Sequence, residues 1–313
     1  MAGLIGTIAV TDFGWYTYLV GRPGLEEANF WKPSATRAAR APQFSPYLFK
    51  LRAPHNAICG FGFFAGYYRL PDWQAWDLFG DGNGCGSLTE MRERIGDIRD
   101  RIRYRGGDAL QVGCVLIAQP TFFPRERWVP PPRDWPPRTQ VDKRYDLEDG
   151  EGRRIWEDCI AVAESLAGTR TLASEPLTEQ RRHGQPRVVV PRLGQGLFRL
   201  AVTEAYKGAC SVTGEHSLPA LEAGHIRPFA SDGPHAVNNG VLLRADIHRL
   251  FDRGYVTVTP NAHLVISSRL KRDFENGRSY YPLHGRQLRL PDLPADRPAA
   301  AYLRWHNERV FLD

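Results

Sequence analysis

Hydrophobic and polar residues alternate along several short stretches in the first half of the chain, as they do in strands with one buried face. The clearest pattern is a hairpin, in which residues 47–51 form one strand, residues 53–56 turn, and residues 57–68 return through glycines and aromatic residues. Glycines in the returning strand predict bulges or close backbone approach, as a small curved barrel requires. A continuous apolar run at residues 109–123 predicts a buried strand. The first half of the chain therefore predicts a small β-barrel.

Helical spacing of apolar residues alternates with these strands. A long amphipathic helix is expected over residues 87–106. Residues 124–137 are too rich in proline for a helix or a strand, so they predict a surface strap. Helical spacing returns at residue 151, and a helix with a basic connector fills residues 151–185. The pattern predicts an N-terminal domain at residues 1–185 and a C-terminal domain at residues 186–313.

Residues 210–258 carry the most informative pattern in the chain. His225 lies on an expected short strand, and the pair Asn239 and Gly240 marks a turn. The stretch 242–254 has helical spacing, with its apolar residues on one side. The predicted order is a strand, a loop, a second strand and a helix, with His225 on the first strand and His248 on the helix.

This order of residues resembles the HNH nucleases, also called ββα-metal nucleases, and especially a bacterial subgroup of them. A single histidine or Asn-Gly pair is more often structural, but many matches in the proper order make a specific signal. A weaker match extends over residues 190–313. The matching residues are Cys210, Thr213, Gly214, Glu222, Ala223, His225, Ile226, Asn239, Gly240, Asp246, His248, Leu250, Phe251, Asp252 and Gly254.

The resemblance implies a role for each of three residues. His225 would be the general base that takes a proton from water, which suits an imidazole because its ordinary pKa lies near neutral pH. His248 would be a ligand of a divalent metal that polarises the scissile phosphate. Asn239 would orient the loop and the base histidine, and in one-metal relatives an asparagine can itself be a ligand.

The chain departs from the family at Gly224, where many HNH nucleases have an aspartate or a histidine as a second metal ligand. Asp252 lies one helical turn after His248 and can supplement the site, while Glu222 and Asp246 remain open as further candidates. Oxygen-rich ligation with one imidazole favours Mg²⁺ or Mn²⁺. The predicted metal ligands are His248, Asn239 and Asp252.

The composition of the chain bears on its expected partner, its use of cysteine and its compartment. The chain has 313 residues, of which 42% are hydrophobic and 24% are charged, as in globular proteins, and its net charge of +6 favours a polyanionic partner. The five cysteines are far apart and form no Cys-x-x-Cys pair, so neither a structural zinc nor a disulfide scaffold is expected. Nothing at the N-terminus has the pattern of a signal peptide, and no apolar run reaches the length of a membrane span. A cytoplasmic protein without a membrane partner is therefore expected.

The first domain resembles, at the level of fold, the PUA-like group of small β-barrels, which includes modified-base readers fused to HNH nucleases in bacterial restriction enzymes. The stretches NFWKPS, LFKLRAPHNAICGFGFF and AWDLFGDGNG carry this weaker resemblance. It implies that a nucleotide flipped out of the duplex stacks in an aromatic pocket. Core packing is the competing interpretation for the aromatic residues. The candidate pocket residues are Trp31, Phe63, Tyr67 and, as an acceptor for a cytosine amino group, Asp77.

The sequence thus predicts an α+β protein with a PUA-like barrel and an HNH domain. Its predicted function is a metal-dependent endonuclease of the restriction type that cuts double-stranded DNA carrying a modified base, with a cytosine derivative favoured. Arg227, Arg244 and Arg249 are candidates for contacts to DNA phosphates. Because one HNH motif cuts one strand, a homodimer or a transient dimer on DNA is expected. The alternatives are a nicking, homing or toxin-type nuclease with little sequence preference, and a non-catalytic reader with a degenerate HNH motif.

Overall fold

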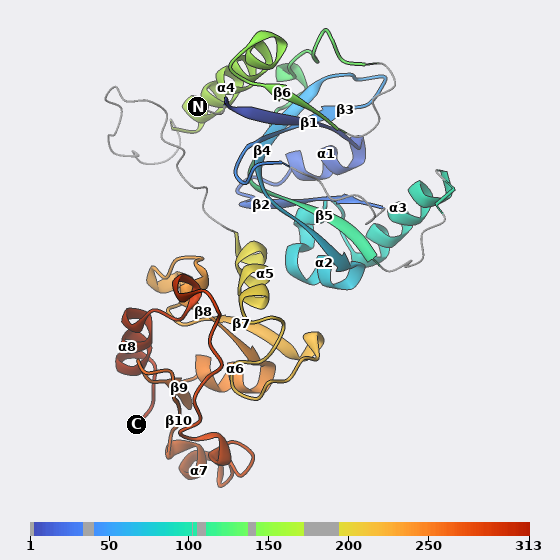
Figure 1. Ribbon diagram of the computed structural model, residues 1–313. Coiled ribbons are helices and arrows are strands. Elements are labelled where there is room, and N and C mark those ends of the chain that lie inside the picture. The colour runs from blue at the N-terminus through green and yellow to red at the C-terminus, as the bar shows by residue number, and fades with distance from the viewer. Residues whose placement is uncertain (1–2, 34–40, 102, 105–110, 137–141, 172–193) are drawn as a thin grey trace. The chain divides into compact units, whose positions relative to one another are not determined.

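The computed structural model describes residues 3–33, 41–101, 103–104, 111–136, 142–171 and 194–313. The chain divides into two compact units, Met1–Arg192 and Leu193–Asp313 (Figure 1). The domain boundary predicted between residues 185 and 186 lies outside the described residues.

The first unit is built on one six-stranded sheet. Its strands are β1 (Ile5–Thr11), β2 (Glu27–Lys32), β3 (Pro46–Leu51), β4 (Ile58–Pro71), β5 (Gln111–Phe122) and β6 (Asp142–Asp146). Their order is β2-β5-β4-β3-β1-β6, with β1 and β3 parallel and the other neighbours antiparallel. Lys32 on β2 lies 3.4 Å from Asp142 on β6, so the two edge strands approach each other and the sheet curls in the manner of a barrel.

The hairpin of β3 and β4 and the buried strand β5 confirm the predicted strands. The pairing of β4 with β5 shifts register between Phe61 and Phe63 and again between Phe64 and Gly66. At Gly60, φ is +155° and an added Cβ would lie 2.3 Å from the carbonyl oxygen of Thr121. The glycines therefore mark bulges and a close backbone approach, as the sequence predicts.

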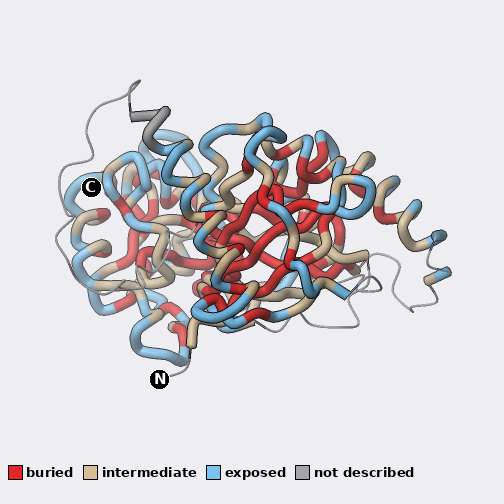
Figure 2. Tube along the Cα trace, turned by 90° about the horizontal axis from the view of Figure 1, so that it is seen from above, coloured by how far each residue is buried: buried red, intermediate tan, exposed pale blue. Residues whose placement is uncertain are grey.

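Two hydrophobic clusters cover the opposite faces of this sheet. Ile8 on β1 belongs to the cluster that includes Ile155 of α4 (Gly150–Thr171), whereas the next residue, Ala9, belongs to the cluster that includes Trp15 of α1 (Phe13–Val20). Successive residues of a strand point to opposite faces, so α1 and α4 lie on different sides of the sheet. The buried residues of both units are drawn in red along the chain trace in Figure 2. The helices are α1 (Phe13–Val20), α2 (Asp72–Phe79), α3 (Leu88–Arg101) and α4 (Gly150–Thr171).

The second unit has its own hydrophobic core, which includes Phe198, Leu243 and Phe251. Strands β7 (Leu221–His225) and β8 (Gly240–Arg244) pair antiparallel, and α6 (Ala245–Asp252) follows β8 directly, which confirms the predicted order of strand, loop, strand and helix. The elements are α5 (Gln195–Ala205), β7 (Leu221–His225), β8 (Gly240–Arg244), α6 (Ala245–Asp252), β9 (Val256–Val258), β10 (Leu264–Ile266), α7 (Arg269–Phe274) and α8 (Ala300–Arg309). Among the helices that the structure describes, none is long and apolar enough to cross a membrane.

Candidate active site

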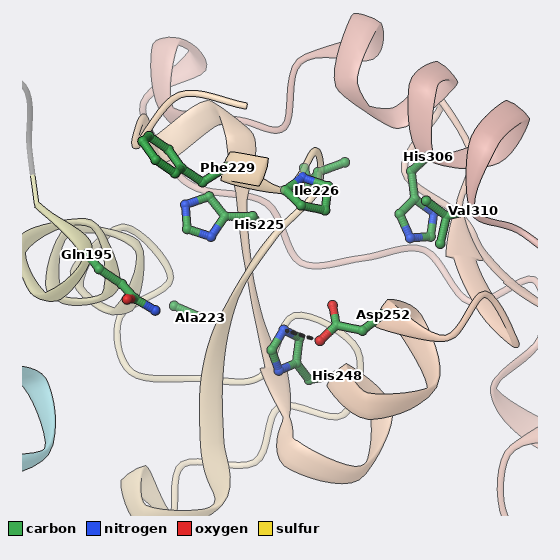
Figure 3. A pocket seen from close by; sticks show the side chains of 10 residues that line it. Gln195, Ala223, His225, Ile226, Phe229, His248, Asp252, His306 and Val310 are labelled. Atoms are coloured by element: carbon green, nitrogen blue, oxygen red, sulfur yellow. Dashed lines mark ion pairs between the residues drawn. The ribbon is translucent and has the colours of Figure 1, made fainter. Parts of the chain in front are cut away.

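One pocket of the second unit collects the two histidines that the sequence singles out. It is lined by residues from β7, from the loop after it, from α6, and from α5 and α8. His225 comes from β7, whereas His248 and Asp252 come from α6 (Figure 3). Three predicted site residues from two elements therefore face the same space. The lining residues are Gln195, Ala223, His225, Ile226, Pro228, Phe229, His248, Asp252, His306 and Val310.

The local sequence explains why α6 presents its polar residues to this pocket. Ile247 and Phe251 are buried in the hydrophobic core, each 1% exposed, which fixes the rotation of the helix. His248 and Asp252 are four residues apart and thus lie one above the other on a neighbouring face. The amphipathic spacing that predicts the helix also predicts which side chains it turns toward the pocket.

His225 is held between an aromatic ring and a second histidine. Its imidazole stacks on Phe198, with ring centroids 3.8 Å apart and planes 13° apart. Its Nε2 lies 2.9 Å from Nδ1 of His235. Burial, followed by the nearby charges of His235 and His248, lowers the pKa of His225 to about 4. The imidazole is therefore neutral at physiological pH, the form in which it can accept a proton.

His248 has a carboxylate beside each ring nitrogen. Its Nδ1 lies 2.6 Å from Oε2 of Glu222 on β7, and its Nε2 lies 3.5 Å from Oδ2 of Asp252, the pair marked by the dashed line in Figure 3. A carboxylate on one nitrogen fixes the tautomer of a histidine and directs the other nitrogen at a cation. Glu222 therefore orients His248, and Nε2 and Asp252 offer a nitrogen and an oxygen on the same side.

These donors fit a hard divalent cation that keeps several water ligands. No group of three or more His, Cys, Asp or Glu residues in the described part of the chain is arranged to hold a metal ion. Mg²⁺ commonly binds through one or two carboxylates and completes its octahedron with water and substrate phosphate oxygens. Two protein donors, Nε2 of His248 and the carboxylate of Asp252, thus suit Mg²⁺ or Mn²⁺. Asp246 is engaged elsewhere, because Arg244 donates to both of its oxygens at 2.7 and 2.8 Å.

Gly224 makes room for the ring of His248. A Cβ added at Gly224 would lie 2.5 Å from Cδ2 and from Nε2 of His248. The residue at which the chain departs from the family pattern is therefore the one over which the imidazole of His248 lies. An aspartate or histidine here cannot coexist with this position of the ring.

We expect Gly224→Ala to displace that ring and to weaken the site. The added methyl group overpacks the space beside β7, which should lower the free energy of unfolding by about 1–3 kcal/mol, and it should break the contact of His248 with Glu222. The Mg²⁺ concentration for half-maximal cleavage should rise roughly 10- to 100-fold. Gly96→Ala is the control, since nothing lies within 4 Å of that added Cβ. Equal metal requirements for the two variants would contradict this account of Gly224.

Asn239 is fully buried and its amide is used to hold a loop. Its Oδ1 accepts the backbone N–H of Arg227, and its Nδ2 donates to the carbonyl oxygens of Arg227 and Pro234, each at 2.9 Å. Both amide atoms are engaged with the backbone, so this arrangement favours the loop-orienting role over direct ligation of a metal.

The three arginines predicted to meet DNA differ in their surroundings. Arg227 donates to the carbonyl oxygen of Ser231 at 2.5 Å, and its guanidinium lies 5.6 Å from the ring centroid of Trp305. Arg244 is paired with Asp246. Arg249 is exposed on α6. Of the three, Arg249 is the one whose position on the surface best suits a contact to phosphate.

The candidate residues for a modified-base pocket are not brought together in the first unit. Phe63 packs into the cluster that includes α4, and Tyr67 packs into the cluster that includes α1. Trp31 follows Phe30, which lies in the same cluster as Tyr67, so the ring of Trp31 lies on the opposite face of the sheet from Tyr67. On that face, Nε1 of Trp31 donates to the carbonyl oxygen of Asn83 at 2.9 Å. Asp77 is exposed on α2. Packing against the core accounts for Phe63 and Tyr67.

Sequence reasoning missed three residues, of which His306 lines the pocket and the other two contact His225. The ring of Phe198 stacks on that of His225, and Nδ1 of His235 lies at hydrogen-bond distance from Nε2 of His225. His306 on α8 is 2% exposed, stacks on Phe251 with centroids 3.8 Å apart, and has its Nδ1 2.8 Å from Oγ1 of Thr257. A signal for His235 exists in the sequence, since it is a second histidine in the loop that ends at Asn239. Phe198 and His306 carry no motif that singles them out.

Comparisons with known proteins bear on both units. Residues 210–259 match the model of a family described as HNH endonuclease, which confirms the predicted resemblance and the fold class of the second unit. No curated protein matches the chain. ASCH from Zymomonas mobilis is a similar solved structure, with 12% identity and a TM-score of 0.34 over 49% of this chain and 94% of that one. The modification dependent TagI restriction endonuclease is 24% identical, with a TM-score of 0.29 over 39% of each chain.

Proposed function

Starting from the HNH endonuclease domain that residues 210–259 form, we propose that this protein is a metal-dependent DNA endonuclease whose cutting centre is the pocket of His225, His248 and Asp252. The observation that carries the proposal is the convergence of a neutral imidazole and a histidine-carboxylate pair, from β7 and α6, on one space. Hydrolysis of a phosphodiester needs both a proton acceptor and a site for a cation.

His225 is the proposed general base. Burial keeps its imidazole unprotonated, and its stacking on Phe198 holds the ring in place for one orientation of the attacking water. His248 and Asp252 are the proposed ligands of Mg²⁺ or Mn²⁺, with His248 held in its tautomer by Glu222. When bound, the cation would act as a Lewis acid on the scissile phosphate. Asn239 holds the loop that follows the base.

The proposed substrate is double-stranded DNA, and we propose a restriction-type enzyme in which the first unit selects DNA with a modified base, a cytosine derivative being favoured. The support is the excess of positive charge and the sequence resemblance of the first unit. Arg249, exposed on the helix of His248, is the proposed contact to a phosphate near the cut, with Arg227 and Arg244 as weaker candidates. Cleavage of both strands calls for two copies of the centre, so a homodimer or a transient dimer on DNA is part of the proposal.

A second candidate is a nicking, homing or toxin-type nuclease with little sequence preference. One observation favours it: Phe63 and Tyr67 pack into separate clusters and do not form one aromatic pocket. A non-catalytic reader with a degenerate HNH motif is the remaining alternative.

A panel of plasmids decides between these functions. Otherwise identical plasmids with different cytosine and adenine modifications would be incubated with the full chain and Mg²⁺ or Mn²⁺. We expect cleavage of plasmids with a modified cytosine and at least about tenfold slower cleavage of unmodified DNA, a difference of about 1.4 kcal/mol in transition-state binding. Equal cleavage of all plasmids would favour the nonspecific nuclease. Binding without cleavage of any plasmid would favour the reader.

A further inference from the structure

The pair formed by His225 and His235 decides which nitrogen of the base carries a proton. Nε2 of His225 and Nδ1 of His235 are 2.9 Å apart, a hydrogen-bond distance. When both imidazoles are neutral, one of these two nitrogens must carry the hydrogen and the other must offer a lone pair. The contact therefore links the tautomers of the two rings.

The two arrangements differ in what they leave on His225. If Nε2 of His225 donates to His235, its Nδ1 keeps a lone pair and can accept a proton from water. If His235 donates instead, Nδ1 of His225 already carries a hydrogen and the ring cannot act as a base there. Within the described part of the chain, no residue forms a hydrogen bond with Nδ1 of His225. Only the first arrangement leaves a nitrogen available for catalysis.

The surrounding residues hold His235 in place for this contact. The ring of His235 stacks on Phe229, with centroids 4.6 Å and planes 6° apart, while His225 is backed by Phe198. Asn239 donates to the carbonyl oxygen of Pro234, the residue before His235, and also to that of Arg227, two residues after His225. One buried amide thus joins the two ends of the loop that carry the two histidines.

We propose that His235 is a positioning residue that accepts the Nε2 hydrogen of His225 and so keeps Nδ1 of the base in its proton-accepting form. Asn239 acts on the base through this contact, since it fixes the part of the loop from which His235 extends. The inference rests on the proposed function of His225 as general base, but the tautomer that it assigns is a property of the free protein.

The tautomer can be measured without any activity. The full chain would be labelled with ¹⁵N-histidine, and the imidazole signals of its nine histidines would be recorded at neutral pH. The His225 signals are those absent from His225→Ala. We expect the Nε2–H tautomer for His225 in the unsubstituted protein. In His235→Phe, which keeps an aromatic ring beside Phe229 but removes the acceptor, we expect a mixture of tautomers. An Nδ1–H tautomer in the unsubstituted protein would overturn the proposal.

Kinetics give the second arm of the test. His235→Phe should lower kcat roughly 10- to 100-fold with KM for DNA and the metal requirement unchanged. His235→Asn, whose side-chain oxygen can accept in place of Nδ1, should retain most of the activity. Equal rates for the Phe variant and the unsubstituted protein, or equal losses in both variants, would count against the assignment. If the unsubstituted protein cuts no DNA, the proposed function fails, and the NMR result still decides the tautomer.

Discussion

His225→Ala slows cleavage strongly and leaves DNA binding intact: this is the expected result if the imidazole on β7 is the general base. Loss of a positioned general base lowers the rate about 10²- to 10⁴-fold. The side chain is half-buried against Phe198, but its removal touches no residue proposed to hold the metal, so metal binding should persist. Cleavage of supercoiled plasmid and binding to the same DNA with Ca²⁺ in place of Mg²⁺ would be measured in parallel.

The matched control is His216→Ala, because His216 is an exposed histidine of the same unit outside the pocket. Its activity should equal that of the unsubstituted protein. The thermal unfolding of both variants would show whether a loss of activity reflects the missing base or a disturbed fold. If His225→Ala cuts DNA at the unsubstituted rate, His225 is not the base, and the cutting centre proposed around it is wrong.

The core of the site could be predicted because it depends on local periodicity. The spacing of Ile247 and Phe251 fixes which side of α6 is buried, and the same spacing turns His248 and Asp252 toward the pocket. The motif also predicts a strand at His225, and that residue is the last of β7. The role of Gly224 could not be predicted, because the space over a glycine depends on a ring that approaches from another element.

The partner of His225 could not be predicted from spacing. His235 lies ten residues further on, in a loop whose path is set by the hydrogen bonds of one buried amide, that of Asn239. No periodic pattern encodes such a path. The sequence marks the histidine as a candidate, but its contact with the base follows only from how the loop closes.

The separation of Phe63 from Tyr67, two residues of the predicted base pocket, has a different physical reason. Phe63 and Tyr67 are four residues apart, and in a regular strand that spacing puts both side chains on one face. The bulge between Phe64 and Gly66 shifts the register by one residue, so the two aromatic rings end on opposite faces. The glycines predict bulges in this strand, but the face on which each ring ends depends on where each bulge falls between the two aromatic residues.

Substitution of His248, in the proposed cation site, also has a large expected effect on cleavage. His248→Ala removes the nitrogen donor of the proposed cation site and leaves Glu222 and Asp252 as two carboxylates without the imidazole between them. Cleavage should fall roughly 10³-fold or more, since Lewis-acid stabilisation of the transition state is worth several kcal/mol. Excess Mg²⁺ or Mn²⁺ should not restore the rate, because a cation bound by the carboxylates alone lacks the nitrogen donor that places it in the pocket.

Glu222→Gln separates orientation from ligation at this centre. The amide can still contact Nδ1 of His248 at the observed 2.6 Å position but carries no charge, so the activity should fall only about 10- to 100-fold and recover partly at high metal concentration. Calorimetric titration with Mn²⁺ would follow binding directly. Cleavage that survives both chelation and His248→Ala would exclude the proposed metal at Nε2.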